Sequence, residues 1–372
     1  MSRSRVRSLL AVLGVVSACV WTTSAHAVPR YSARYEQNCM LCHVNPSGGG
    51  MRSEYAVQEL IPRELAMSAH RPAAFTALES HLNKAVRIGA DFRHQFMLED
   101  EDSPQSGVQG FFPMQGDVHL SFQLDEKYLL YVRRGMSNTY DLWALAHVLP
   151  YDGYVKAGRF TPPYGWHFDD HTAYVRSELG FAPPANTDAG IELGLAPKRG
   201  DLQVAITNGN LGGLLDNDRR LAVAASGGVR FKLGPAAAYL GASGYTRPGL
   251  IADLNMAGAY GSLSWGAFTW VGEADAVRRD PAVGPAKRSA VASHELSWLV
   301  RQGVEVVGTY DWADPNRDLK SGSRSRWGLG ARVLPQPFLE TQLMYRHTEV
   351  TPGPDVKESS WDEAVVQFHF MF

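Results

Sequence analysis

The residues Cys39-Met40-Leu41-Cys42-His43 form a C-x-x-C-H sequence, which places two thiols and an imidazole within five positions. A c-type haem is attached covalently to such a sequence, because the two thiols add to the two vinyl groups of the porphyrin. The histidine beside the second cysteine offers a ring nitrogen to the iron as the proximal ligand. We therefore predict that Cys39, Cys42 and His43 bind one haem c, with His43 as the metal ligand.

Three other interpretations of this sequence are a redox dithiol, half of a zinc site, and chance. A thioredoxin-like dithiol belongs to a βαβ setting, which the surrounding sequence does not show. A structural zinc site needs four ligands, and no second Cys/His pair lies nearby. The haem interpretation requires export, because haem c is attached outside the cytoplasm.

Residues 1–27 have the three parts of a secretory signal peptide. Three arginines among the first seven residues precede an apolar run at 9–20, and Ala-His-Ala at 25–27 is an A-x-A cleavage site. We expect an exported protein whose mature chain keeps only two thiols, with no disulfide framework. The residues before Cys19 also resemble a lipidation site, so the fate of that cysteine stays open.

The composition excludes several classes of function. The net charge of −2 provides no basic field for nucleic acid. The sequence contains no Ser-His-Asp arrangement, phosphate-binding loop or dinucleotide fingerprint that would indicate hydrolysis or NAD chemistry. After the leader there is no run of about 18 apolar residues that would form a transmembrane helix.

Residues 28–84 are predicted to form a small α-helical c-type haem domain. A turn-rich bend at 46–50 follows the haem sequence, and helical patterns cover 51–60, 63–70 and 74–83. A segment of this length supplies a small hydrophobic core, and a covalent cofactor is a common remedy.

The sixth ligand of the iron is not evident from the sequence. Met51, Met67, His70 and His81 are all in reach along the chain. A methionine would raise the reduction potential relative to a second histidine. We predict His70 or His81 as this ligand.

Residues 85–372 are predicted to form β-strands, because apolar residues alternate with polar residues or glycine. The alternation is strict in 86–93, 118–124, 191–195 and 327–333, and in 364–372 Gln367 and His369 separate the apolar positions 366, 368 and 370. A period of two over about ten residues is typical of strands with one apolar and one polar face. His94 is an exception on the apolar face, which places it at a membrane interface or at a shift in register.

Two further features favour a transmembrane barrel over a soluble β-sandwich. Short and long connections alternate, as in barrels with tight periplasmic turns and longer outer loops. A sandwich would also bury many charged residues in its core, where unpaired charge is costly, whereas a wet lumen accommodates them. These residues are Arg87, Asp91, Arg93, Asp117, Glu192, Glu295, Arg324, Arg326, Glu340 and Arg346. We predict an all-β transmembrane barrel of about 16 antiparallel strands, whose aromatic last strand ending at Phe372 resembles an outer-membrane address.

Residues 157–171 follow a predicted strand and are rich in turn formers and polar aromatics. A constricting loop that folds into the lumen and an ordinary surface loop are both open. His167, Asp169, Asp170 and His171 combine imidazole and carboxylate groups, which suit iron or manganese. They are candidates to contact a metal ion, although such clusters in loops are more often simply solvated.

A signal peptide, one N-terminal C-x-x-C-H and a barrel of about 16 strands together resemble the fused outer-membrane monohaem cytochrome–porins. That family is best known for the iron oxidases of ferrous-iron-oxidising bacteria. The resemblance covers the mature chain in architecture and rests in sequence on Cys39, Cys42 and His43. The iron oxidases continue with a Pro-Leu-x-x-Phe-Gly-Arg run, whereas this chain has Val-Asn-Pro-Ser-Gly-Gly-Gly-Met-Arg at 44–52, so the electron donor stays open.

The resemblance implies an electron-transfer protein of the bacterial outer membrane, with its haem domain in the periplasm or inside the lumen. Its partners would be outer-membrane lipid, a periplasmic c-type cytochrome or other carrier, and an extracellular metal ion or mineral. With Fe(II) as donor, the activity would resemble an Fe(II):cytochrome c oxidoreductase. Because the hydrocarbon is about 30 Å thick, one haem bridges it only from inside the lumen.

Two alternatives remain. One is a transport porin whose haem domain acts as a plug, gate or sensor. The other is a barrel that receives electrons from separate periplasmic cytochromes. The direction of electron flow depends on a potential that the sixth ligand helps to set.

Overall fold

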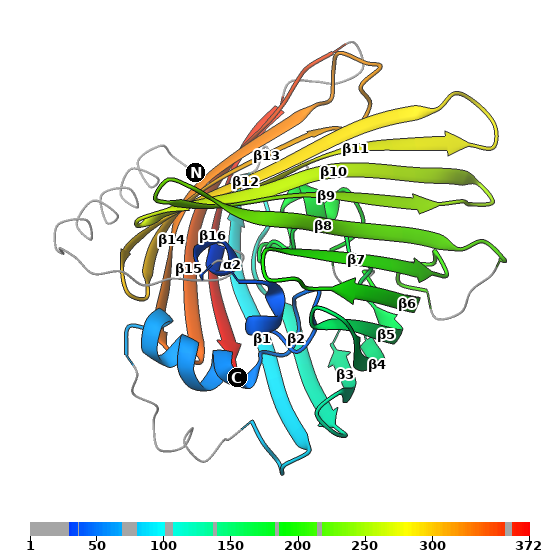
Figure 1. The fold of residues 1–372 in the computed structure, drawn as a ribbon. Helices are drawn as coiled ribbons and strands as arrows, with labels where there is room; N and C mark the ends of the chain where they lie inside the picture. Colours follow the sequence, from blue (N-terminus) through cyan, green and yellow to red (C-terminus); the bar gives the residue numbers. More distant parts are fainter. Residues whose placement is uncertain are drawn as a thin grey trace.

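The protein folds as a closed barrel of 16 antiparallel strands, in which each strand pairs with its neighbours in the chain and β1 pairs with β16 (Figure 1). The computed structural model describes residues 30–35, 37–68, 80–100, 107–136, 140–182, 186–213, 218–353 and 359–372. The strands are β1 (Val86–Glu99), β2 (Gln109–Gln123), β3 (Tyr128–Gly135), β4 (Tyr140–Leu149), β5 (Gly153–Phe160), β6 (Asp188–Leu195), β7 (Gly200–Thr207), β8 (Ala222–Leu233), β9 (Ala236–Arg247), β10 (Ala252–Trp265), β11 (Phe268–Pro281), β12 (Lys287–Arg301), β13 (Val304–Asp314), β14 (Arg324–Gln336), β15 (Leu339–Val350) and β16 (Ser359–Met371). The predicted barrel is therefore confirmed.

The alternation in the sequence separates an apolar outer face from a charged lumen. Phe92, Trp298 and Phe370 are exposed on the outside of the barrel, whereas Asp91 and Arg326 are buried inside it. Residues that are opposite each other on neighbouring strands point to the same face of the barrel. Phe92, for example, is opposite Phe370 in the β1–β16 register, and both are on the outer face. The charged residues are thus directed inward, as predicted, and ion pairs compensate many of them.

The exception in the alternation, His94, keeps its outward position. Its ring stacks on Phe111, with the ring centroids 6.1 Å apart. The β1–β2 register shifts between Arg93 and His94, where Arg93 is opposite Gln115 and His94 is opposite Pro113. A bulge in β2 therefore accompanies the irregularity, which confirms the predicted shift in register.

Short helical elements precede the barrel strands, and one interrupts them. They are α2 (Arg30–Tyr35), the 3-10 turn η1 (Cys39–Leu41), the π-helix η2 (Ala56–Leu65) and, after β5, α4 (Tyr174–Ser177). The predicted helix at 51–60 is displaced toward the C-terminus, and the one at 63–70 is wrong, because the backbone becomes extended at Ala66. The helix predicted at 74–83 falls largely outside the described residues. No helix in the described part of the chain is long and apolar enough to cross a membrane.

Segment 37–68 lies along the inner wall and at one mouth of the barrel. Figure 1 shows its helical elements beside the ring of strands, with η2 near the C-terminal end of β16. Residues of η2 pack with Leu334 and Met371 in one buried cluster. The Gln302 side chain donates to the carbonyl oxygens of Arg63 and Ala66 at 2.9 and 2.8 Å, so η2 is fixed at the end of the barrel that carries the short turns.

Candidate functional site

The C-x-x-C-H sequence forms a single tight turn. The backbone N–H groups of Cys42 and His43 donate to the carbonyl oxygen of Cys39 at 3.2 and 3.0 Å. Both thiols are free rather than joined in a disulfide. The turn therefore presents two separate thiols and an imidazole together, as covalent haem attachment requires.

Burial argues against a reactive dithiol at this turn. It raises the pKa of the Cys39 thiol to about 12, with a further contribution from the Asp201 carboxylate. It also raises the pKa of Cys42 to about 11. Reactive cysteines depend on a lowered thiol pKa, so the redox alternative has no electrostatic support here.

Residues 44–51 leave the turn and return to it as a compact loop. Val44 N–H donates to the Met51 carbonyl at 2.9 Å, and Ser53 N–H donates to the Cys42 carbonyl at 2.9 Å. Between these contacts, the three glycines at 48–50 have positive φ angles of 91°, 75° and 67°. This left-handed backbone is readily adopted only by glycine, which explains the unusual Gly-Gly-Gly run.

Gly50→Ala is expected to disrupt this loop far more than Gly49→Ala. Both substitutions force alanine into the left-handed region, at a cost of about 1–2 kcal/mol. A Cβ at Gly50 would lie 2.6 Å from Oη of Tyr131, whereas a Cβ at Gly49 would lie in ordinary contact, 3.7 Å from Nδ1 of His167. The measurement is the amount of covalent haem staining relative to the amount of folded barrel. Equal values for the two variants would contradict the predicted clash between the new Cβ and Tyr131.

A buried lysine ties the loop to the barrel wall. Lys156 on β5 pairs with Glu192 on β6 at 2.9 Å, and both side chains are 0% exposed. The same ammonium group donates to Oδ1 of Asn45 at 3.0 Å and to Oγ of Ser47 at 2.8 Å. One cation therefore neutralises a wall carboxylate and holds the loop beside the haem sequence.

A second attachment is centred on Asp91 of β1. Its carboxylate accepts a hydrogen bond from Arg52 at 2.9 Å, and it lies 3.1 Å from Nε2 of His119 and 2.9 Å from Nε2 of His369. His119 contacts the Tyr131 hydroxyl at 2.7 Å, and Met51 N–H donates to that hydroxyl at 3.2 Å. One hydrogen-bond network thus joins strands β1, β2, β3 and β16 to segment 37–68.

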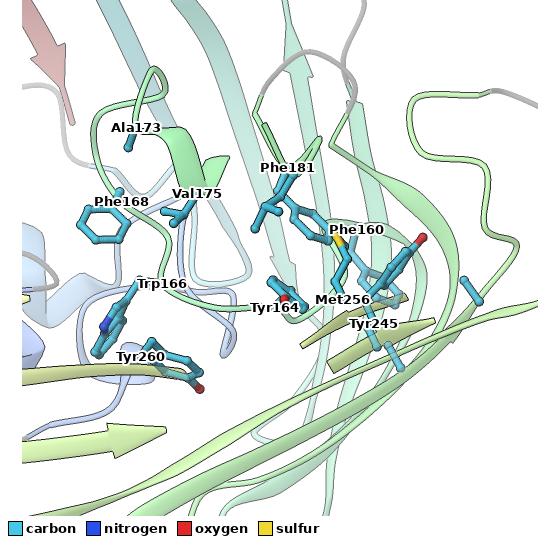
Figure 2. Packing of buried hydrophobic residues seen from close by; sticks show 14 of the residues in the cluster. Phe160, Tyr164, Trp166, Phe168, Ala173, Val175, Phe181, Tyr245, Met256 and Tyr260 are labelled. Atoms are coloured by element: carbon cyan, nitrogen blue, oxygen red, sulfur yellow. The ribbon is translucent and has the colours of Figure 1, made fainter. Parts of the chain in front are cut away.

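The segment between β5 and β6 folds into the lumen, which confirms the constricting-loop interpretation over the surface loop. Its Asp169 pairs with Arg93 on β1 at 2.7 Å, and its Asp170 pairs with Arg346 on β15 at 2.6 Å. Figure 2 shows Tyr164, Trp166, Phe168 and Val175 of this loop as part of a buried apolar cluster that includes Tyr260 of the wall. We call residues 161–187 the inward loop.

The haem sequence and the inward loop enclose one cavity. It has a volume of about 260 Å³ and is lined by residues of both segments and of the wall. The described lining includes the thiol-bearing Cys39 and Cys42, the imidazoles of His43, His167, His171 and His369, the aromatic side chains of Tyr131, Tyr154, Trp166, Tyr239 and Tyr260, and the guanidinium groups of Arg52, Arg93, Arg133, Arg176 and Arg230. Carboxylates of Asp91, Asp141, Asp169, Asp201 and Glu340 also line the cavity, which is therefore aromatic and carries charges of both signs.

The residues of this cavity fit a c-type haem. His43 is in the lining, and its Nδ1 is buried with no hydrogen-bond partner among the described residues. Burial, and then the charge of Arg52, lowers the pKa of His43 to about 4, so the imidazole is neutral and has a lone pair for a metal. Nε atoms of Arg93 and Arg133 are also buried without partners in the described structure, while the other nitrogens of these guanidinium groups pair with Asp169 and with Asp117 and Asp141.

The four candidates for the sixth ligand of the iron lie in different places. His70 lies outside the described residues. His81 is absent from the cavity lining and instead lies 3.6 Å from the Glu54 carboxylate. Met51 lies against Gly89 of the wall, and Met67 against Gly303 at the barrel end.

The four residues proposed to contact a metal ion do not form a metal site of their own. The carboxylates of Asp169 and Asp170 are occupied by Arg93 and Arg346. Within the described ranges, no group of three or more His, Cys, Asp or Glu side chains is arranged to hold a metal ion. The two histidines instead line the cavity together with the C-x-x-C-H turn, a proximity that their distance along the chain conceals.

Comparisons with known proteins identify the fold. No family model and no curated protein sequence matches the chain. Solved structures with a similar fold include the anion-selective porin from Comamonas acidovorans (TM-score 0.60, 12% identity), covering 77% of this chain and 99% of that one. Pseudomonas putida OprB has a TM-score of 0.62 at 9% identity, with 81% and 96% covered. The Acinetobacter baumannii outer membrane channel DcaP has a TM-score of 0.56 at 9% identity, with 77% and 97% covered. The chain therefore has the porin-like barrel fold.

Proposed function

We propose that this protein is an outer-membrane electron-transfer barrel that holds one covalent haem c inside its lumen. The observation that carries the proposal is the position of the Cys39–His43 turn, which faces the lumen cavity between η2 and the inward loop. Bound there, the haem would supply reversible one-electron chemistry at its iron. The chain would supply two thiols, a proximal imidazole and a cavity lined by aromatic and charged side chains.

The position of the site in the lumen supports this function because of the thickness of the membrane. A bilayer hydrocarbon core is about 30 Å thick, so a single redox centre connects its two sides only when it lies within that thickness. Residues of the inward loop and of η2 line the cavity, so a haem bound there would be bordered by protein on these two sides. The expected partners are a periplasmic c-type cytochrome or another carrier on the side of the short turns, and an extracellular metal ion or mineral, such as Fe(II), on the other.

A second candidate is a transport porin in which the N-terminal segment is a plug, gate or sensor. The comparisons favour this candidate, because the similar structures are porins and a channel. The plug itself argues against free diffusion, since segment 37–68 is attached to the wall through Lys156, Asp91 and Gln302.

Vesicle experiments separate the two candidates. In the first arrangement, the purified protein is inserted into vesicles that contain oxidised cytochrome c, and Fe(II) is added outside. In the opposite arrangement, the vesicles contain ferricyanide, and reduced cytochrome c is added outside. Electron transfer in either arrangement that disappears in Cys39→Ala/Cys42→Ala supports the conduit. Sugar-driven swelling of the vesicles without electron transfer would support the porin and overturn the conduit.

The outer-membrane location has its own expected result. A closed barrel resists mild detergent, so unheated protein is expected to migrate differently from boiled protein in an electrophoresis gel. The protein is also expected to sediment with membranes after washing in high salt. Release into the soluble fraction, with one mobility before and after boiling, would contradict this location.

A further inference from the structure

We propose that His167, on the inward loop, is the second axial ligand of the haem iron. This inference rests on the proposed haem attachment. A haem iron needs only two ligands from the protein, because the porphyrin supplies four nitrogens, so the absence of a larger metal cluster among the described residues is no obstacle. His43 provides one imidazole, and the inward loop brings a second one to the same cavity.

His167 is the inward-loop histidine that lies beside the haem segment. A Cβ built on Gly49 would be 3.7 Å from its Nδ1, which places the ring next to the loop that follows the C-x-x-C-H turn. His43 and His167 both line the cavity, so the two imidazoles border the same space. His171 also lines the cavity, and the contact with Gly49 distinguishes His167 from it.

The backbone on both sides of His167 is fixed to the wall. Trp166 N–H donates to Glu273 at 2.6 Å, and its indole N–H donates to the Gly261 carbonyl at 3.1 Å. On the other side, Arg93 donates to the carbonyl and carboxylate oxygens of Asp169 at 2.8 and 2.7 Å. A ligand held in this way keeps one position in both oxidation states, which limits the rearrangement that accompanies electron transfer.

The test compares His167→Ala with the matched variant His171→Ala, which changes the other histidine of the same loop. The holoprotein is examined by electronic absorption and electron paramagnetic resonance in the ferric state, and by carbon monoxide binding in the ferrous state. We expect a low-spin iron in the unaltered protein and in His171→Ala. In His167→Ala we expect a high-spin iron that binds carbon monoxide rapidly and returns to low spin when imidazole is added.

Several outcomes would overturn the assignment. The assignment is wrong if the iron of His167→Ala stays low-spin without added imidazole. It is also wrong if His171→Ala or His70→Ala loses the low-spin iron instead. If His167→Ala fails to fold, His167→Met is used, and it is expected to raise the midpoint potential, because methionine ligation favours the reduced iron. An unchanged potential in that variant counts against His167. Absence of covalent haem in the unaltered protein would instead overturn the proposed function, so the two failures are distinguishable.

Discussion

Replacing both thiols in Cys39→Ala/Cys42→Ala is expected to abolish covalent haem staining of the denatured protein completely. The thioether bonds to the porphyrin can form only at these two positions, because Cys39 and Cys42 are the only cysteines of the chain after the predicted leader. The measurement is haem peroxidase staining of the boiled protein after electrophoresis. Each single variant keeps one possible bond and is expected to stain more weakly than the unaltered protein.

The barrel itself serves as the control for this variant. Both thiols belong to segment 37–68 and take no part in strand pairing. The double variant is therefore expected to retain the mobility shift between unheated and boiled samples. Full staining in the double variant would eliminate covalent attachment at this turn, and with it the proposed electron conduit.

Lys156→Met is expected to destabilise the folded barrel by about 3–5 kcal/mol, which is the cost of leaving a buried carboxylate without its cation. Lys156 and Glu192 are both 0% exposed and lie 2.9 Å apart, so water cannot replace the lost charge without opening the wall. Among the described residues, only the Tyr154 hydroxyl would still donate to Glu192, at 2.6 Å. The measurement is the urea concentration at which the unheated, fast-migrating form is lost.

The matched control is Lys156→Met/Glu192→Gln, in which the unpaired charge is removed. This pair is expected to recover most of the barrel stability, because a neutral amide costs much less to bury than a carboxylate. It is not expected to recover the haem yield fully, because Asn45 and Ser47 lose the ammonium group that held their loop. A double variant as unstable as the single one would show that the ion pair is not the cause.

The barrel could be predicted from the sequence because its rule is local. Each strand of a membrane barrel alternates between lipid and lumen, so a residue such as Phe92 or Asp91 reveals its side through its immediate neighbours. The short turns could be predicted for the same reason, from a few consecutive residues. The C-x-x-C-H sequence could be recognised for the same reason, because its two thiols and its imidazole lie within one turn.

The contents of the lumen could not be predicted, because contacts between distant segments determine them. Neither the attachment of Asn45 to Lys156 nor the approach of Gly49 to His167 is indicated by any pattern near those residues. The helix boundaries were misplaced for a similar reason. The backbone leaves the helical conformation at Ala66, where the next residue, Met67, donates its N–H to the Leu334 carbonyl at the barrel mouth.

The enclosure of the Cys39–His43 turn has a consequence for the order of biosynthesis. In the finished protein, Cys42 packs against the cluster formed by η2, Leu334 and Met371 on one side, and the inward loop covers the other side of the cavity. An enzyme that joins porphyrin to the thiols needs an unfolded and accessible chain. If haem is attached at this turn as proposed, attachment is expected to precede the pairing of β1 with β16, and the chain would already carry its haem when it is inserted into the membrane.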